Sequence, residues 1–419
     1  MGLFRRNKNT NKPVIKQILD LVPRWLLISC TNTYKTDKGC SKYKTYDQFV
    51  ALTYGQLYKC HTLSDISTGI GVSEIFISDH GLQQSPARST MSDGNKKRNY
   101  QVYESLYYRL LSHYKSILKK HHKSYIVEEI KGQSVKLIDS STIPLCLSMF
   151  DWAKFRTAKG GVKIHTCLDV DVMLPDVVNI SDAKLHDRHG LEQLIFPKNT
   201  IIIEDRAYFD FTLMLNRIAA GNIFVTRIKT NTVYETIEEL ELPEGKNEHI
   251  VKDEIIRLTS PKAIKTGISE QKLRLVHVYK EDENKIIEII TNQLEWEALT
   301  ISELYKKRWD IELFFKALKQ NLQVKTFVGT SENAVKSQIF IALITYLLLE
   351  LIRRTTAKKT PAFTSFVEKI RMSLCFYLSL DYVCNKMNEG AKKGRQPTQL
   401  TFERNKDFFS QNKQLSLYG

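Results

Sequence analysis

Four polar side chains near the C-terminal third of the chain have types and spacing that suit phosphate or metal chemistry. Tyr305, Arg308, Glu312 and Lys319 follow one another at intervals of three, four and seven residues. On one continuous helix, at 100° per residue, they would fall within an arc of about 60°. One carboxylate flanked by two cations suits a place where phosphate and metal meet. A solvated helix face with an Arg308–Glu312 ion pair is the simpler alternative.

Two further carboxylates stand where short apolar runs end. Asp139 follows the run 135–138, and Asp205 follows the run 201–203 and Glu204. A carboxylate at the end of a buried strand costs several kcal/mol unless it is paired or binds a metal. Taken alone, either Asp is more simply the start of a turn or a helix N-cap. Together with Glu312 they form a candidate catalytic triad.

The spacing of the first four residues resembles the signature of DDE-type insertion-sequence transposases. That signature is Tyr, two residues, Arg, three residues, Glu, six residues and Lys, and this chain matches it in full. The resemblance covers roughly residues 10 to 350. It also includes three other segments: Ile138-Asp139-Ser140-Ser141-Thr142, Asp205-Arg206-Ala207-Tyr208, and Ser89-Thr90-Met91-Ser92 with Lys96-Lys97-Arg98.

The resemblance implies an α/β fold with a ribonuclease-H-like catalytic core, interrupted by a β-rich insertion and preceded by a helical N-terminal domain. The residue pattern agrees, since helical periods at 46–58 and 100–118 give way to strand-like runs after about residue 126. The predicted parts are a helical DNA-binding domain at 1–125, the core at 126–228 and 298–355, the insertion at 229–297, and a helical, basic C-terminal region at 356–419.

The resemblance further implies a DNA transposase that cuts at element ends and joins the 3′-hydroxyls to target DNA. Two Mg²⁺ ions, with Mn²⁺ a possible substitute, would be held by the carboxylates and would activate the nucleophile and stabilise the leaving oxygen. The expected partners are double-stranded DNA, as element terminal repeats and target, and a second copy of the chain in a synaptic homodimer. The metal ligands would be Asp139, Asp205 and Glu312, and the DNA contacts Tyr305, Arg308, Lys319, Lys159, Lys163 and Arg98.

Composition agrees with a polyanionic partner. The chain has 62 Lys and Arg against 46 Asp and Glu, a net charge of +16. Seven Cys without paired spacing favour a reducing compartment, so we expect a cytoplasmic, nucleoid-associated protein. No membrane segment is expected, because the most apolar stretch, 339–352, is too short to span a bilayer and contains Glu350.

Three alternatives stay open at this level. The chain could be a DNA-binding regulator descended from a transposase, or a metal-dependent nuclease that cuts without joining. In the N-terminal third, Leu63 to Phe76 carries glycines at a likely turn, and a helix-turn-helix and a plain helical hairpin fit it equally well. The basic run Arg88 to Arg98, which we expect among turn residues, favours phosphate contacts nearby.

Overall fold

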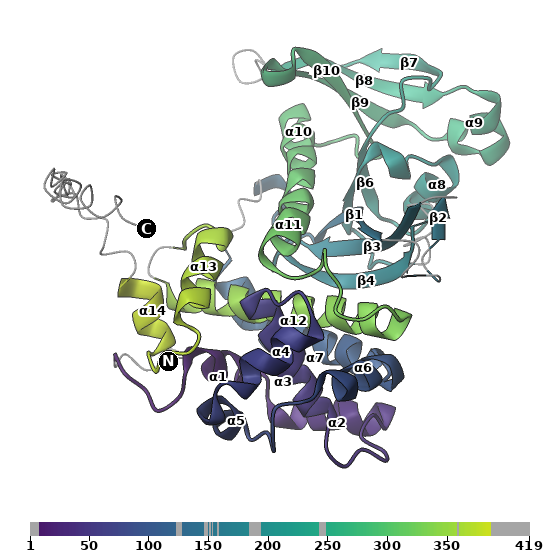
Figure 1. The fold of residues 1–419 in the computed structure, drawn as a ribbon. Coiled ribbons are helices and arrows are strands. Elements are labelled where there is room, and N and C mark those ends of the chain that lie inside the picture. Colours follow the sequence, from purple (N-terminus) through teal and green to yellow (C-terminus); the bar gives the residue numbers. More distant parts are fainter. Residues whose placement is uncertain are drawn as a thin grey trace, which may run out of the picture.

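A helical part and a sheet part share one long helix in the computed structural model (Figure 1). The structure describes residues 8–122, 128–145, 150, 152, 154–156, 159–183, 194–242, 249–357 and 360–386. One hydrophobic core cluster runs through both parts and includes Val14, Leu106, Ile203 and Leu348. The two parts are therefore packed as one body around shared apolar side chains.

Within the described residues 8–122, seven helices form the N-terminal part, and the longer predicted helices are confirmed. Apolar residues at helical spacing place one face of each in the core, as in the last helix, where Leu106, Leu110 and Leu118 are buried. A turn separates two helices here, but the predicted glycines do not form it, because Gly69 and Gly71 belong to the first helix and the turn follows at Val72 and Ser73. The helices are α1 (Val14–Leu19), α2 (Arg24–Tyr34), α3 (Thr45–Tyr58), α4 (Leu63–Gly71), α5 (Glu74–His80), α6 (Arg88–Lys97) and α7 (Gln101–Lys120).

The imidazole of His80 makes the helical part sensitive to acid. His80 is fully buried and stacks on Phe76 with 3.9 Å between ring centroids, and its Nε2 has no hydrogen-bond partner among the described residues. Burial lowers the pKa of His80 from 6.5 to about 4. The unfolded state therefore binds the proton first, and stability is lost as pH falls from 6.5 towards 4.

We expect His80→Phe, which keeps an aromatic ring on Phe76, to reduce this acid-dependent loss by up to about 3 kcal/mol. Urea unfolding of wild type and variant at several pH values between 6.5 and 4 measures it. His122, whose pKa burial also lowers to about 4, would account for a remaining dependence. An unchanged pH dependence in the variant would show that His80 does not control acid stability.

The sheet part has the mixed order expected of a ribonuclease-H-like core, and that fold class is confirmed. Its first strand, β1, lies between antiparallel β3 and parallel β5, and β5 pairs in parallel with β6. The helix α8 (Phe211–Ala219), capped by the Asp210 side chain, connects these last two strands. The strands are β1 (Val135–Leu145), β2 (Lys154–Arg156), β3 (Lys159–Asp169), β4 (Leu174–Asp182), β5 (Ile201–Glu204) and β6 (Ile223–Arg227).

The β-rich insertion continues the same sheet. Its last strand pairs antiparallel with β6, with Ile289 opposite Arg227, and the other insertion strands add outward from there at the top of Figure 1. The sequence could not show this pairing, so the predicted boundary at residue 229 stays a prediction. The elements are β7 (Tyr234–Glu239), β8 (Ile250–Leu258), α9 (Pro261–Thr266), β9 (Leu273–Lys280) and β10 (Lys285–Thr291).

The helices α10 (Ala298–Lys306) and α11 (Arg308–Asn321) run along one face of the sheet, and α12 (Glu332–Thr356) lies between the sheet and the N-terminal helices (Figure 1). With 25 residues, α12 is longer than the apolar stretch that the sequence suggested. It is the one helix among the described residues that is long and apolar enough to cross a membrane, and 94% of its most apolar window is buried inside the protein.

The C-terminal helices α13 (Phe363–Ser373) and α14 (Leu380–Lys386) return to the N-terminal part. Asn9 and Leu378 form an antiparallel bridge, and Arg371 donates to the backbone oxygens of Leu57 and Asn321. The expected helical C-terminal region is therefore present as far as Lys386. Its basic continuation lies outside the described residues.

Candidate active site

Strand register places two of the predicted carboxylates next to each other on the sheet. Leu137 of β1 pairs with Ile203 of β5, and Ile203 pairs with Val225 of β6. All three side chains enter the same core cluster, so they share one face. Side chains alternate between the two faces along a strand, so the residues two positions after these three lie on the same face. They are Asp139, Asp205 and Arg227. Asp205 keeps an extended backbone, which continues the alternation past the end of β5.

The four-residue stripe that the sequence predicts on one helix is divided between two helices, so the single-helix expectation is wrong. Tyr305 belongs to α10, whereas Arg308, Glu312 and Lys319 belong to α11. At the junction, Lys307 N bonds Leu304 O at 3.0 Å, an i−3 pattern that tightens the turn. Tyr305 and Arg308 still meet across this junction, with the guanidinium 5.8 Å from the ring centre.

The positive charge of Arg308 interacts with Glu312, Asp139 and Asp205. Its Nη1 lies 2.6 Å from Glu312 Oε1. Tyr305, Glu312 and Asp205 raise the pKa of Arg308 against the opposing effect of burial. The ion pair named as the simpler alternative is therefore present, but it lies against the two strand carboxylates rather than on a solvated face.

Burial controls the protonation of Asp139. Desolvation raises the pKa of this carboxyl from 3.8 to about 6, while the Ser140 N–H, 2.7 Å from Oδ1, and Arg308 lower it. The charges of Asp205 and Glu312 also act on it and raise it. The structure thus brings the charges of Asp205, Glu312 and Arg308 close enough to Asp139 to act on its protonation. We call these four residues the coupled group.

The donor set suits a hard divalent cation, although the carboxylates are not closed around a single point. Among the described residues, no three His, Cys, Asp or Glu groups are placed to hold one ion together. Glu312 instead directs Oε1 to the guanidinium of Arg308. Mg²⁺ usually takes only one or two carboxylates and keeps water or phosphate oxygens as its other ligands. The partly desolvated Asp139 carboxyl therefore fits such an ion.

Two of the predicted lysines, Lys319 and Lys163, contact or pair with β1. Lys319 Nζ donates to Thr142 O at 3.0 Å, and burial lowers the pKa of Lys319. Lys163 of β3 pairs in register with Thr142 of β1. Thr142 is three residues from Asp139, so strand alternation places the Lys163 side chain on the face of the sheet opposite to Asp139, whereas Lys319 reaches β1 from α11. Lys159 belongs to β3, but its side chain lies outside the described residues.

The structure places Arg98 elsewhere, at the end of α6 in the helical part. Only 6% of the residue is exposed, and Nη1 and Nη2 donate to Gln48 Oε1 at 2.8 Å and Tyr43 O at 2.7 Å. The basic run that contains it is helical rather than a set of turns, which corrects that expectation. Because the N–H groups of the guanidinium already donate to protein oxygens, we propose a structural role for Arg98 in place of a DNA contact.

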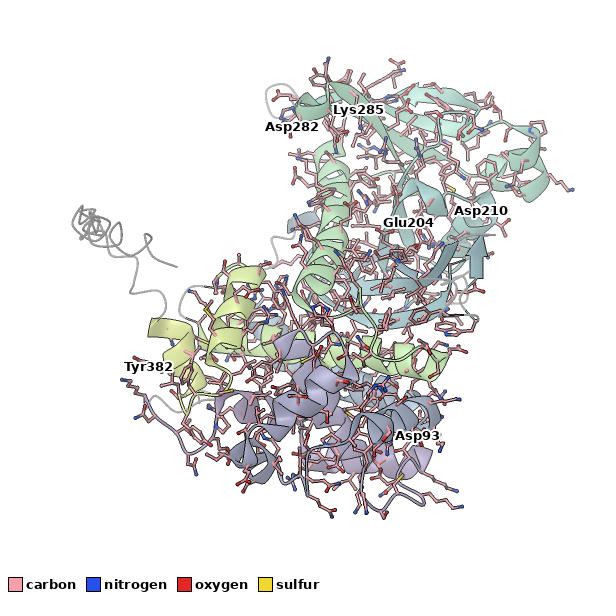
Figure 2. The ribbon with its side chains drawn as sticks, viewed as in Figure 1. Asp93, Glu204, Asp210, Asp282, Lys285 and Tyr382 are labelled. Carbon is pink, nitrogen blue, oxygen red and sulfur yellow. The ribbon has the colours of Figure 1, made fainter. Side chains whose placement is uncertain are left out.

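A cavity of ≈ 440 Å³ opens beside the coupled group, between the insertion and the α10–α11 junction. Its lining includes Tyr279, Glu281, Tyr305, Arg308 and Trp309, and Trp309 is 57% exposed. Figure 2 shows Asp282 and Lys285, from the rim of this cavity and the adjoining strand, near the upper end of α10. The insertion is thus close enough to shape access to Tyr305 and Arg308.

Arg227 is a candidate that the sequence analysis missed. It ends β6, one strand beyond Asp205, and its charge acts to lower the pKa of Tyr305. The available signal was a cation at the end of an apolar run, where Asp139 and Asp205 also stand. Recognising it required the register between β5 and β6, which only the structure provides.

Comparisons with known proteins agree with this geometry. A family model described as a transposase DDE domain matches residues 130–348, and another, described as a domain of unknown function, matches residues 10–74. The chain is 30% identical over 249 residues to the "Probable transposase for insertion sequence element IS5377" of Geobacillus stearothermophilus, covering 59% of this chain and 64% of that protein. The chain therefore spans less than two thirds of that relative.

Two other relatives carry related names. The y4zB protein of Sinorhizobium fredii, also named as a transposase, is 28% identical over 272 residues, which cover 64% of this chain and 72% of that protein. "Transposase InsG for insertion sequence element IS4" of Escherichia coli is 26% identical over 213 residues, or 48% of this chain and 44% of that protein. The DDE-domain match covers more than half of the chain and contains all three coupled carboxylates, so the chain belongs to the DDE transposase family.

Proposed function

We propose that this protein is a DNA transposase that cuts at the ends of an insertion sequence and joins them to target DNA, as a homodimer acting at the nucleoid. One observation carries the proposal: Asp139, Asp205 and Glu312 come from three distant parts of the chain and meet in one coupled group with Arg308. Structural ion pairs do not require a partly desolvated carboxylate within one strand and a second carboxylate just past the end of the neighbouring strand.

Each residue of the group then has a part in phosphoryl transfer. Asp139, Asp205 and Glu312 would hold two divalent ions, Mg²⁺ or Mn²⁺, which activate the attacking oxygen and stabilise the leaving one. Arg308 and Arg227 present cations to the non-bridging oxygens of the phosphate. Lys319 approaches the DNA backbone from the side of β1, and Tyr305 offers a hydroxyl at the edge of the cavity. Lys163 projects from the opposite face of the sheet and therefore has no part at this site.

Glu312 has two alternative partners in this scheme. In the structure it binds Arg308, which neutralises its charge. As a metal ligand, Glu312 would have to leave the guanidinium, and Arg308 would then be free to contact phosphate. In the resting site, Glu312 and Arg308 therefore pair with each other. In the active site, Glu312 would pair with metal and Arg308 with phosphate.

A metal-dependent nuclease without joining activity is the second candidate, because the same carboxylates serve cleavage alone. A regulator without chemistry is less well supported, since it would not need the coupled carboxylates that the structure retains. Joining of pre-cut ends separates the nuclease from the transposase.

A cleavage assay tests the proposal. Its substrate is a labelled duplex with the sequence found at the end of the insertion sequence that encodes this protein. In Mg²⁺, wild type should nick this duplex, whereas Glu312→Gln should bind it with similar affinity and cleave at least about 1,000-fold more slowly. Glu303→Gln is the matched control, because Glu303 pairs with Lys306 at the surface of α10. Equal cleavage by wild type and Glu312→Gln would contradict the assignment.

A further inference from the structure

A loop rich in lysine joins α2 to α3 in the helical part. We call residues 35–44 the lysine loop; it contains Lys35, Lys38, Lys42 and Lys44, all exposed. Its one acid, Asp37, is used internally, because Oδ1 accepts from Thr45 N and Thr45 Oγ1, each at 2.6 Å. Among the ion pairs of the described residues, none involves Lys35, Lys38 or Lys42. The loop therefore presents uncompensated positive charge.

The lysine loop forms one wall of a cavity of ≈ 540 Å³, and α6 forms the other. The wall from α6 contributes Thr90, Asp93 and Lys97. Asp93 and Lys97 pair with each other at 3.5 Å, and both side chains are more than 70% exposed. Figure 2 shows Asp93 on the helical part, well separated from Glu204 in the sheet. This groove is therefore distinct from the carboxylate site.

Arg98 holds the two walls of the groove together. Its Nε donates to Thr36 O at 3.4 Å and its Nη2 to Tyr43 O at 2.7 Å, which are near the two ends of the lysine loop. Nη1 donates to Gln48, whose Nε2 donates to Asn95 of α6 at 2.6 Å. The buried guanidinium thus fixes the loop relative to α6 and keeps its lysines in a defined arrangement.

The other candidate DNA surface in this part of the chain has the opposite charge. Residues 62–80, which include α4 and α5, contain Asp65, Glu74 and Asp79 and neither Lys nor Arg. Phe76 and His80 of α5 are buried against the helical core. A recognition helix normally lies among cations that contact phosphates. The charge distribution therefore favours the groove over a helix-turn-helix at α4 and α5.

The groove also has a structural connection to the catalytic helix. The segment after α11 leads to the start of α12, where Asn333 Nδ2 donates to Lys96 O at 3.2 Å and Asn333 Oδ1 accepts from Tyr100 N at 3.4 Å. Lys325, in that segment, is exposed and its charge acts on Lys319. Cations therefore follow one another from Lys319 on α11, through Lys325 on the next segment, to the lysines of α6. The helix α6 forms one wall of the groove.

We propose that the groove between the lysine loop and α6 binds the phosphate backbone of duplex DNA. Lys35, Lys38 and Lys42 contact phosphates, and Arg98 is the positioning residue that fixes the loop. The inference rests on the proposed function, because it states which surface of the helical part holds the DNA on which the carboxylate site acts.

Salt dependence of binding tests this surface. The probe is a fluorescein-labelled duplex of mixed sequence, long enough to span both parts of the protein, and the readout is anisotropy over a range of salt concentrations. Each phosphate contact contributes about 0.9 to the slope of log K against log salt. For the full-length double variant Lys38→Gln/Lys42→Gln we expect a slope shallower by about 1.8 and affinity about 10- to 30-fold lower near physiological salt.

The matched control is Lys115→Gln/Lys119→Gln, which removes the same charge from α7. These lysines pair with Asp169 and Asp171 at 3.2 and 2.5 Å, so we expect little change in slope. Equal slope changes in both double variants would overturn the proposal, because net charge alone would then explain the loss. The proposal also fails if Ile75→Ser/Ser78→Ala on α5 weakens binding while the lysine-loop variant does not.

The outcomes separate this proposal from the proposed function. Wild type that binds the duplex, with an unchanged slope in the lysine-loop variant, overturns the groove alone. Wild type that binds no duplex at all overturns both. For Arg98→Met we expect weaker binding than wild type at every salt concentration, with the three lysines still in place.

Discussion

Asp139→Asn is expected to remove cleavage and joining by at least about 1,000-fold while making the metal-free protein more stable. Burial raises the pKa of Asp139 from 3.8 to about 6. Between these values the unfolded state releases its proton first, so the folded state loses stability as pH rises and remains less stable at neutral pH. A neutral Asn avoids this cost. Because Asp139 is partly exposed, we expect a gain of about 1–2 kcal/mol.

Urea unfolding in EDTA at neutral pH measures the stability change, and a duplex cleavage assay in Mg²⁺ measures the activity. Asp310→Asn is the control on α11, two residues from both Arg308 and Glu312 and so on the opposite side of that helix. It should retain cleavage. A variant Asp139→Asn that is inactive but also less stable would indicate that Asp139 has a structural role instead of a catalytic one.

Arg308→Gln is expected to reduce cleavage by about 100-fold and to make stability depend more strongly on metal. Without the guanidinium, Glu312 loses its 2.6 Å partner, and Asp139 and Asp205 lose the cation that acts on both. The repulsion should lower metal-free stability by about 1–2 kcal/mol. Divalent cation should restore much of it, so the rise in melting temperature on adding Mg²⁺ should exceed that of wild type.

Lys306→Gln provides the comparison for this variant, since Lys306 pairs with Glu303 on the exposed side of α10. Its metal-free stability should change by less than about 0.5 kcal/mol. Adding Asp139→Asn to Arg308→Gln should recover stability, because it removes one of the uncompensated charges. If Mg²⁺ shifts the melting temperature of wild type and Arg308→Gln equally, Arg308 does not take the place of metal charge at the carboxylates.

The catalytic core could be predicted because its residues follow apolar runs or lie on a helix with clear periodicity. Apolar runs at 135–138 and 201–203 located β1, which contains Asp139 and continues to Leu145, and β5, which precedes Asp205. The four-residue signature located Glu312. The strand alternation that puts both aspartates on one face follows once the parallel pairing of β1 and β5 is known. That pairing depends on residues far apart in sequence, so the sequence could suggest it only through the family resemblance.

The features that sequence missed depend on long-range packing or on local backbone detail. Arg98 is part of a basic run, but the pocket formed by Thr36, Tyr43 and Gln48 is what buries it. The break between α10 and α11 at Lys307 has no Gly or Pro to signal it. The register of β6 is what brings Arg227 beside Asp205. Charge alone also could not show that the lysine loop and α6 face each other across a groove.

Joining of pre-cut ends is the most direct test of the central claim, that one coupled carboxylate group performs transposition chemistry. A duplex of the element's boundary with a free 3′-hydroxyl is incubated with supercoiled plasmid, Mg²⁺ and either wild type or Glu312→Gln. Wild type should yield plasmid joined to the labelled strand, dependent on the 3′-hydroxyl and on divalent metal, and Glu312→Gln should bind both DNAs without product. Wild type that binds and nicks the duplex but never joins it would contradict the transposase assignment and leave a nuclease.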